Sequence, residues 1–360
     1  SVILNILVVY ILHFIWYKVR FNILLITGII SISSTNLFGY DSGLSVISKE
    51  EFIQLRGKRI GVVVNHTTID STGKHLIELF YEAGIDITAI FSPEHGFAGI
   101  AEAGQKIVDD TDPLTGAPIY SLYGKIKKPS KDMLKHIDLL VFDIQDIGVR
   151  YYTYVSTLTM VMETAAEVGL PIFILDRLNP LGCNIRGPVL DVRYSSFVGL
   201  HPIPVQHGMT IGELATMINE EGWLSNNQKA NLTIVRYGGF TNKEHARRAF
   251  HPAPSPNMQD LETAWNYTGL CLIEGTNLSE GRGTNLPFKV IGAPWINNRE
   301  LFESILPYID KNDIIDTISF TPRKIEGKSS YPKYKNQECK GLRIWNLEDP
   351  IKWTVYLFKI

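Results

Sequence analysis

The strongest constraint on the fold is a repeated alternation of short apolar runs with amphipathic, helix-like segments. Runs rich in β-branched residues lie at 59–65, 86–91, 138–143 and 171–176, and apolar residues recur at helical spacing over 75–83 and 153–168. Strands that are apolar along their whole length are typical of a parallel sheet with helices on both faces. The sequence therefore predicts a doubly wound, Rossmann-like α/β domain.

The second half of the chain follows a different pattern. A helix is predicted over 209–221, where Thr210 and Glu213 have the spacing of a capping box. Strands are predicted at 231–237, at 269–274 and around Ser319, and a helix at 298–308. This mixture predicts a smaller α+β domain.

The domain boundaries follow from this change. We assign the Rossmann-like domain to residues 45–185, beginning with a helix that Ser48 caps and that continues to Leu55. The α+β domain takes residues 186–360. Its last residues, 353–360, contain no helix ending or turn, so we expect the domain to be truncated at its C-terminus.

Residues 1–40 have the composition of a targeting segment. Apolar runs at 2–17 and 21–32 flank Lys18 and Arg20, and small polar residues follow. A positive region, an apolar stretch and a small polar tail are typical of a secretory signal peptide. A two-part membrane anchor is the alternative, although neither run reaches the roughly 20 residues of a typical membrane-spanning helix. Either interpretation predicts export to the periplasm or the exterior, with membrane attachment through this segment alone.

Composition and missing motifs exclude several function classes. The net charge of −2 provides no basic surface for nucleic acid. The three cysteines, Cys183, Cys271 and Cys339, have neither metal-ligand spacing nor the number for a disulfide framework. The sequence contains no nucleophile elbow, zinc-protease motif, Walker loop or dinucleotide fingerprint. We therefore expect neither a cofactor nor a metal.

Polar residues gather where the predicted strands end. Open parallel sheets bind ligands beyond the carboxyl ends of their strands, so these residues predict one polar pocket. The carboxylates are Glu94, Asp143, Asp146, Glu274 and Glu280; the amides are Asn65, Gln145, Asn277 and Asn285; the remaining groups are His95, Tyr151, Tyr152, His207, Arg150, Arg177 and Arg282.

The contents of this pocket suit a polyhydroxylated ligand with an anionic group, because an arginine can hold a carboxylate through a bidentate fork. Cleavage of a glycosidic bond needs a proton donor and usually a second carboxylate. We predict Glu94 as the acid, since Pro93 and Gly96 fix its turn.

Structural roles are the alternative for several of these residues. Asp143 and Asp176 could cap helices, Arg177 could pair with Asp176 or Asp191, and His207 could be a hydrogen-bonded loop residue. Trp223, Trp265 and Trp295 fit a hydrophobic core as well as a sugar-binding platform.

A series of motifs resembles a known family. NHTT, FSPEHGF, DIQDIGVRYYTY, LDRLNPLG, HGMTIGELA, PSPNM, EGTNLSEGRGTNLPF and GAPW occur in this order between about residues 60 and 295. The chain thus resembles the NamZ-type exo-β-N-acetylmuramidases, first catalogued as a domain of unknown function.

This resemblance implies a Rossmann-like domain joined to a smaller C-terminal domain, with the active site in the cleft between them. It implies release of β-1,4-linked N-acetylmuramic acid from non-reducing ends of peptidoglycan fragments, without a cofactor. Glu94 matches the family's proposed catalytic glutamate, and Tyr151, Tyr152, Glu274 and Glu280 match further family positions. We expect Tyr151, Glu274 and Glu280 to join Glu94 in catalysis and Tyr152 to bind substrate.

The substrate adds one hypothesis. Muramic acid differs from glucosamine by a lactyl carboxylate, which Arg150 or Arg282 would recognise. Two alternatives remain open at this point. One is a non-catalytic muropeptide-binding protein, and the other is a metal-dependent hydrolase that uses Asp143, Asp146 and His95.

Overall fold

A computed structural model describes residues 41–99, 110–238 and 250–359. The predicted signal or anchor segment, residues 1–40, lies outside the described residues. Within the described ranges, no helix combines the length and the apolar character that crossing a membrane requires.

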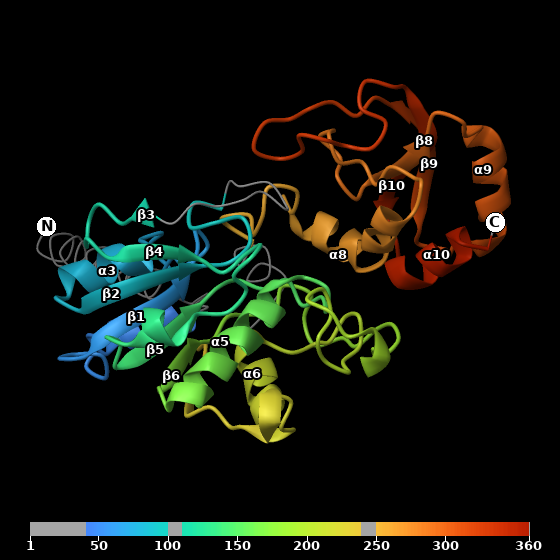
Figure 1. Ribbon diagram of the computed structural model, residues 1–360. Coiled ribbons are helices and arrows are strands. Elements are labelled where there is room, and N and C mark those ends of the chain that lie inside the picture. The colour runs from blue at the N-terminus through green and yellow to red at the C-terminus, as the bar shows by residue number, and fades with distance from the viewer. Residues whose placement is uncertain (1–40, 100–109, 239–249, 360) are drawn as a thin grey trace, which may run out of the picture. The chain divides into compact units, whose positions relative to one another are not determined.

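The larger sheet has seven strands in the order β3-β4-β2-β1-β5-β6-β7 (Figure 1). Its strands are β1 (Arg59–Val64), β2 (Asp86–Ser92), β3 (Asp110–Thr111), β4 (Pro118–Ser121), β5 (Leu139–Asp143), β6 (Ile172–Leu175) and β7 (Leu232–Val235). All neighbouring pairs among them are parallel except β3 with β4 at the edge. The predicted Rossmann-like sheet is confirmed.

Helices cover both faces of this sheet, as its apolar strands require. Figure 1 shows α3 on one side and α5 with α6 on the other. Val62 and Val141 pack in the cluster that includes α2 and α3, whereas Val63 and Phe142 pack in the cluster that includes α5 and α6. The helices are α2 (Gly43–Lys49), α3 (Leu76–Glu82), α4 (Lys131–Leu134), α5 (Tyr154–Val168) and α6 (Ile211–Glu220).

Local signals fix the ends of these helices. Thr210 and Glu213 form the predicted capping box at the start of α6. Gly169 ends α5 in the left-handed region, at φ 69°, where a side chain would be strained. The predicted helix over 48–55 is wrong, because Ser42 caps an earlier helix, α2, and Glu51 and Phe52 then take positive φ values.

The larger sheet extends past the predicted domain boundary at residues 185 and 186. β7 pairs in parallel with β6, so α6 and β7 complete the Rossmann-like sheet. The short 3₁₀ helices η1 (Val192–Tyr194) and η2 (Ser225–Asn227) also precede β7.

The predicted strand over 269–274 is wrong. This segment contains the end of α8 (Leu261–Leu270) and the 3₁₀ helix η3 (Cys271–Gly275). Asp260 caps α8 by accepting a hydrogen bond from the Thr263 N–H. The apolar residues of 269–274 therefore continue a buried helix, a case that a short apolar run does not distinguish from a strand.

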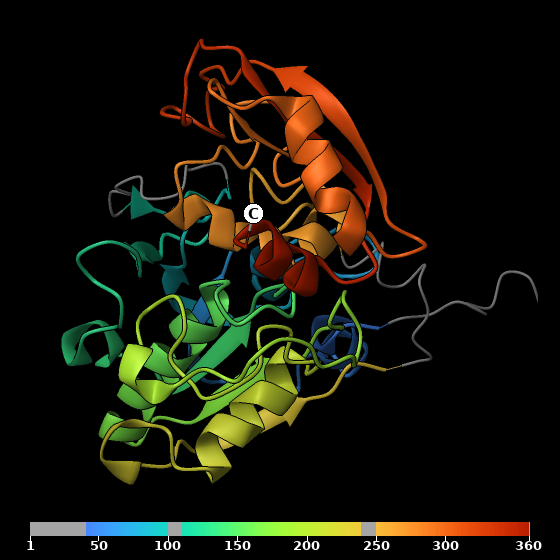
Figure 2. The same ribbon diagram turned by 90° about the vertical axis from the view of Figure 1, so that its right-hand side faces the viewer.

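The smaller sheet is antiparallel, in the order β8-β10-β9. Figure 2 shows this part of the chain, coloured orange to red, at the top of the view. Its strands are β8 (Val290–Ala293), β9 (Ile314–Phe320) and β10 (Cys339–Asn346), and its helices are α9 (Asn298–Ile305), η4 (Leu306–Tyr308) and α10 (Pro350–Leu357). α9 packs on β9 and β10, and α10 packs on α8. The expected α+β character of the C-terminal part is confirmed. Residues 353–360, expected to lack a helix ending, include the end of α10, which Phe358 caps.

Candidate functional site

The loops that follow β1, β2, β5 and β6 lie at one edge of the larger sheet, because these strands are parallel. The ends of these strands and the loops after them carry most of the predicted site residues of this sheet: Asn65, Glu94, His95, Asp143, Gln145, Asp146 and Arg177. Their hydrogen bonds divide them into groups that hold the structure together and groups that remain available to a ligand.

Glu94 belongs to the available groups. It is half-buried in the turn after β2, and its Oε2 accepts a hydrogen bond from Thr153 Oγ1 at 2.7 Å. The neighbouring His95 and Gly96 both take positive φ values, 71° and 74°, so the turn is sharp. Thr153 precedes α5, and its hydroxyl holds one carboxylate oxygen of Glu94 in place.

Tyrosines line the space next to Glu94. Burial raises the pKa of the Tyr152 phenol, and the nearby charges of Asp146 and Glu94 raise it further. Burial also raises the pKa of Tyr154, whose hydroxyl donates to the Pro254 carbonyl at 2.9 Å. Both phenols therefore stay protonated at neutral pH.

Asn65 has a structural position. Its Oδ1 accepts hydrogen bonds from the Thr67 N–H and hydroxyl at 2.9 and 2.6 Å, and its Nδ2 donates to Tyr154 Oη at 3.1 Å. The side chain is fully buried. Asn65 therefore shapes the loop after β1 and holds Tyr154.

Asp143 and Arg177 form a buried ion pair. Arg177 donates through Nε to Asp143 Oδ1 and through Nη2 to Oδ2 at 3.0 Å. The predicted partners of Arg177, Asp176 or Asp191, are wrong for its guanidinium, and Asp143 does not cap a helix. Asp176 instead supports the start of α6, through Thr210 and Gly212. The metal-hydrolase alternative needed Asp143 as a ligand, but both of its oxygens are bonded to Arg177.

Gln145, Asp146 and His207 each retain a buried atom without a hydrogen-bond partner among the described residues. These atoms are Gln145 Oε1, Asp146 Oδ1 and His207 Nε2. The Gln145 side chain is held by donating to the Asp146 and Leu178 carbonyls at 2.7 and 2.9 Å. Buried polar atoms normally have partners, and a bound water or a ligand would supply the partners missing here.

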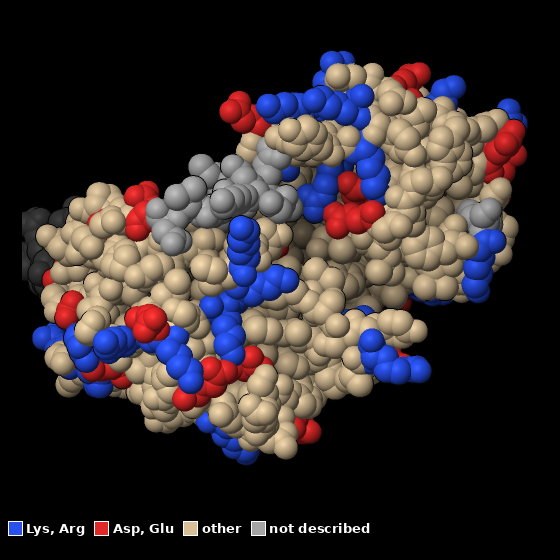
Figure 3. Space-filling model, in the orientation of Figure 1, with Lys and Arg blue, Asp and Glu red and all other residues tan. Residues whose placement is uncertain are grey.

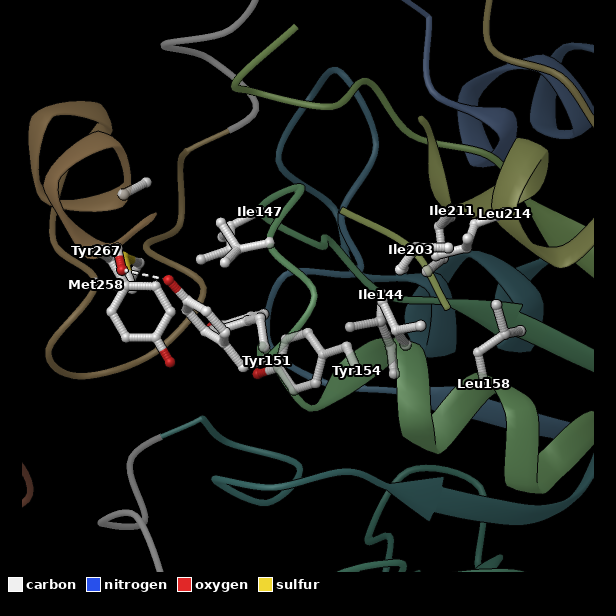
Figure 4. Close-up of a cluster of buried hydrophobic side chains, with 14 of the residues drawn as sticks. Ile144, Ile147, Tyr151, Tyr154, Leu158, Ile203, Ile211, Leu214, Met258 and Tyr267 are labelled. Carbon is white, nitrogen blue, oxygen red and sulfur yellow. Dashed lines mark hydrogen bonds between the residues drawn. The ribbon is translucent and has the colours of Figure 1, made fainter. Parts of the chain in front are cut away.

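Arg150 and Tyr151 connect the site to other segments. Arg150 Nη1 donates to the Pro188 and Ile203 carbonyls at 2.8 and 2.6 Å. Tyr151 points toward α8 (Figure 4), where its hydroxyl donates to the carbonyls of Tyr267 and Thr268. Burial raises the pKa of Tyr151 well above its usual range. Its hydroxyl thus joins the larger sheet to α8.

The remaining predicted residues lie in η3 and in the loop between η3 and β8. Arg282 bonds to the half-exposed Glu274 at 2.7 Å, and the buried Glu280 lies 3.3 Å from Lys333 Nζ. Asn277 and Asn285 are exposed. Figure 3 shows acidic and basic side chains against one another in this part of the smaller-sheet unit.

Several residues that hold the site together were not predicted from the sequence. Thr153 holds Glu94, His66 Nε2 bonds to the Ala253 carbonyl at 2.7 Å, and Lys333 donates to the carbonyls of Ile273, Glu274 and Leu278. His66 stands in the NHTT motif and Thr153 in DIQDIGVRYYTY, so motif position alone would have suggested both. Lys333 lies in no such motif.

A separate cavity of about 1090 Å³ adjoins the loop after β6. Trp265, for which the sequence left a core position or a sugar-binding platform open, lines it, whereas none of the residues assigned to the predicted polar pocket does. Its walls carry several amides and three aromatic rings: Leu178, Asn179, Pro180, Leu181, Gly182, Asn184, Phe250, His251, Gln259, Asp260, Leu261, Glu262, Trp265, Asn312, Asn346, Leu347 and Glu348.

Comparison with known families identifies matches over both parts of the chain. The model described as exo-β-N-acetylmuramidase NamZ, N-terminal, matches residues 60–262, and the corresponding C-terminal model matches residues 265–360. The peptidoglycan β-N-acetylmuramidase NamZ of Bacillus subtilis (strain 168) is 43% identical over 309 residues, which cover 84% of this chain and 72% of that protein.

Solved structures give the same result for the fold. Two crystal structures of DUF1343 family proteins from Bacteroides fragilis NCTC 9343 match with TM-scores of 0.80 and 0.73, at 32% and 37% sequence identity. Each match covers 89% of this chain and 82% of the other.

Proposed function

The chain belongs to the exo-β-N-acetylmuramidase NamZ family, and we propose that it releases β-1,4-linked N-acetylmuramic acid from the non-reducing ends of peptidoglycan fragments. The observation that carries this proposal is the family match over both parts of the chain, together with 43% identity to a peptidoglycan β-N-acetylmuramidase. The half-buried Glu94 and the unpaired polar atoms of Gln145, Asp146 and His207, on loops of the same sheet, support a site for a hydroxyl-rich ligand.

Glu94 is the proton donor in this proposal. Thr153 fixes one of its carboxylate oxygens at 2.7 Å, and the other is left to face the glycosidic oxygen of the substrate. General acid catalysis requires this kind of fixed geometry at the leaving oxygen. Transfer of the proton to that oxygen accompanies cleavage of its bond to the anomeric carbon.

Glu280 is the proposed second carboxylate. It is buried, its Oε2 makes no hydrogen bond with the described residues, and Lys333 Nζ lies 3.3 Å away to compensate its charge. Glu274 is more exposed and paired with Arg282, so it fits a role in shaping the loop.

Arg150 is the proposed reader of the lactyl carboxylate. Arg282 is already paired with Glu274, whereas Arg150 has no carboxylate partner among the described residues and its bonds go to carbonyl groups. Burial lowers the pKa of Arg150, but a guanidinium stays charged. A half-buried cation without a counter-ion favours an anionic ligand.

Replacing Arg150 tests this assignment. We expect Arg150→Gln to reduce the preference for a muramic over a glucosaminide substrate by about 10-fold or more, because a charge-assisted pair is lost. The ratio of kcat/KM for the two substrates is the measurement. Arg193→Gln, in the same loop region but paired with Asp191 at the surface, is the matched control. Equal ratios in Arg150→Gln and the unaltered protein would rule the assignment out.

The cellular setting is part of the proposal. We infer export to the periplasm or exterior, where peptidoglycan fragments occur, with residues 1–40 as a signal peptide or as the one point of membrane attachment. The apolar runs at 2–17 and 21–32 support this inference. Fractionation of cells and N-terminal sequencing of the protein test it.

The activity itself is tested with a substrate pair. Purified protein is incubated with para-nitrophenyl β-N-acetylmuramic acid and with the matching glucosaminide, and with the disaccharide of muramic acid and glucosamine. We expect release from both muramic substrates and little from the glucosaminide. Binding of the disaccharide without turnover would favour the muropeptide-binding alternative.

A further inference from the structure

One carboxylate oxygen of Asp146 is hydrogen-bonded within the protein, and the other has no partner among the described residues. Its Oδ2 accepts a hydrogen bond from the Gly148 N–H at 2.7 Å, while the buried Oδ1 has no partner among the described residues. Gly148 has a φ of 82°, and a Cβ at this position would lie 2.3 Å from Asn179 Oδ1. The loop after β5 therefore requires glycine here and presents Asp146 Oδ1 as a fixed acceptor.

His207 presents a fixed donor next to this acceptor. Its Nδ1 accepts a hydrogen bond from the Met209 N–H at 3.3 Å, so in the neutral ring the proton resides on Nε2. His207 Nε2 is buried, has no hydrogen-bond partner among the described residues and lies 3.8 Å from Asp146 Oδ2. An acceptor and a donor thus stand side by side in a buried place.

A hydroxyl group is the ligand that satisfies both atoms. Its O–H donates a hydrogen bond to Asp146 Oδ1, and the same oxygen accepts a hydrogen bond from the Nε2–H of His207. A trans amide is less suitable, because its N–H and C=O point in opposite directions. An ether oxygen has no proton for Asp146, and a buried carboxylate left without a donor is costly.

The chemistry of the proposed substrate restricts which hydroxyl this is. In a terminal N-acetylmuramic acid, C1 carries the glycosidic bond, C2 the acetamido group and C3 the lactyl ether. Free hydroxyls remain at C4 and C6. The 4-hydroxyl is the one that a further sugar would replace within a chain.

Geometry selects the 4-hydroxyl. Asp146 follows β5 and Glu94 follows β2, with β1 between them, so the two loops are two strand spacings or about 10 Å apart. This span suits one pyranose ring with a hydrogen bond at each end, the glycosidic oxygen at Glu94 and the opposite C4 oxygen at Asp146. The charges of both carboxylates also contribute to the raised pKa of Tyr152, after the larger effect of burial.

We propose that Asp146 and His207 bind the free 4-hydroxyl of the terminal N-acetylmuramic acid and thereby confine cleavage to chain ends. The inference rests on the proposed function and adds the residues that restrict cleavage to chain ends. An internal residue has a substituted 4-oxygen, which cannot donate to Asp146 and which brings another sugar against buried side chains.

Substrate analogues test this directly. The unaltered full-length protein is assayed with para-nitrophenyl β-N-acetylmuramic acid and with its 4-deoxy and 6-deoxy analogues. We expect kcat/KM to fall on the order of 100-fold for the 4-deoxy analogue, the effect of one lost hydrogen bond to a charged group. The 6-deoxy analogue should stay within a few-fold of the parent.

Variants test whether Asp146 causes the discrimination between the parent substrate and its 4-deoxy analogue. In Asp146→Ala, the parent and the 4-deoxy analogue should be cleaved at rates within a few-fold of each other, and Asp146→Asn should restore part of the discrimination. Asp176→Asn is the matched control, since Asp176 is a buried aspartate that supports α6 through Thr210 and Gly212. It should keep the full discrimination between the two substrates.

The possible results distinguish an error in the role of Asp146 and His207 from an error in the proposed activity. Cleavage of the parent with no loss for the 4-deoxy analogue would overturn the role of Asp146 and His207 while leaving the activity intact, and this comparison does not depend on a variant folding. Undiminished discrimination in a folded Asp146→Ala would overturn it too. Failure to cleave the parent would overturn the proposed function and this inference together.

Discussion

At the residue scale, the buried polar side chains differ in whether their hydrogen bonds are already made within the protein. Asn65, Asp143 and Arg177 have their polar atoms bonded to the chain. Asp146 and His207 each retain an unpaired atom, and Glu94 has one oxygen fixed by Thr153. Motifs in the sequence locate both kinds of residue. The motifs do not distinguish residues whose hydrogen bonds are made within the protein from residues with an unpaired atom. The reason is that the partners of Asp143 and Tyr151 come from segments 34 and 117 residues away.

Tyr151 gives a prediction at this scale. We expect Tyr151→Phe to lower the free energy of unfolding by about 1 kcal/mol, because it removes a buried hydroxyl that donates to backbone carbonyls. Activity should fall less than 10-fold, since a phenol whose pKa is raised by burial is a poor nucleophile. Urea denaturation and kcat measure the two effects. A loss of activity of about 1000-fold or more in a folded variant would restore the predicted catalytic role.

At the element scale, the sequence correctly predicts the helices and strands whose type and ends are determined by residues within the segment itself. The strands β1, β2, β5 and β6 are uniformly apolar, and Gly169 and Thr210 mark helix ends, so these elements lie close to their predicted positions. The segment 269–274 is different, because its apolar residues fit a strand or a buried helix equally well. Its packing against α10, which comes some 80 residues later, decides in favour of a helix.

Gly269 tests that packing. A Cβ at this position would lie 2.0 Å from the Pro350 carbonyl oxygen, so α8 and α10 would have to separate. We expect Gly269→Ala to destabilise the protein by about 3 kcal/mol, the upper range for overpacking. Gly275→Ala is the control in the same segment, since a Cβ there meets nothing within 4 Å. Equal unfolding midpoints for the two variants would contradict the tight contact between the helices.

His201 ties the loop before α6 to its surroundings and makes stability depend on pH. It stacks on Trp223 at 5.0 Å and hydrogen-bonds to Thr159 Oγ1 at 2.8 Å. Burial lowers its pKa from 6.5 to about 4. Between these values the unfolded chain binds a proton that the folded protein does not, so the free energy of unfolding decreases as the pH falls through this window.

The size of this effect can be measured. When the pH falls from 7 to 4.5, the free energy of unfolding of the unaltered protein should decrease because of His201. We expect this decrease to be about 2 kcal/mol smaller in His201→Phe, which keeps a ring against Trp223. Urea denaturation at both pH values is the measurement. His66 and His75, whose pKa values burial also lowers, remain in both proteins and cancel in the comparison. The same acid sensitivity in both proteins would show that His201 does not titrate in this window.

At the scale of the whole molecule, the division of the chain follows the two sheets. The two family models meet between residues 262 and 265, at the start of α8, and not near residue 185. The sequence pattern changes after β6 because the long loop before α6 interrupts the alternation, although α6 and β7 still complete the larger sheet. Sheet membership depends on pairing between distant strands, which a pattern along the chain does not record.

The account of function depends on contributions from both units. Glu94, Asp146 and His207 come from the larger-sheet part, and Glu280 with Lys333 comes from the smaller-sheet part. Tyr151 links the two by bonding to the backbone of α8.

The most direct test of the central claim is release of N-acetylmuramic acid from the disaccharide of muramic acid and glucosamine by the unaltered protein and by Glu94→Gln, both shown to be folded by circular dichroism. We predict release by the unaltered protein, and a fall in kcat of about 100-fold or more in the variant, because a sugar leaving group needs a proton that the amide cannot supply. Equal rates in the two proteins would contradict the role of Glu94. No release by the unaltered protein would contradict the proposed activity.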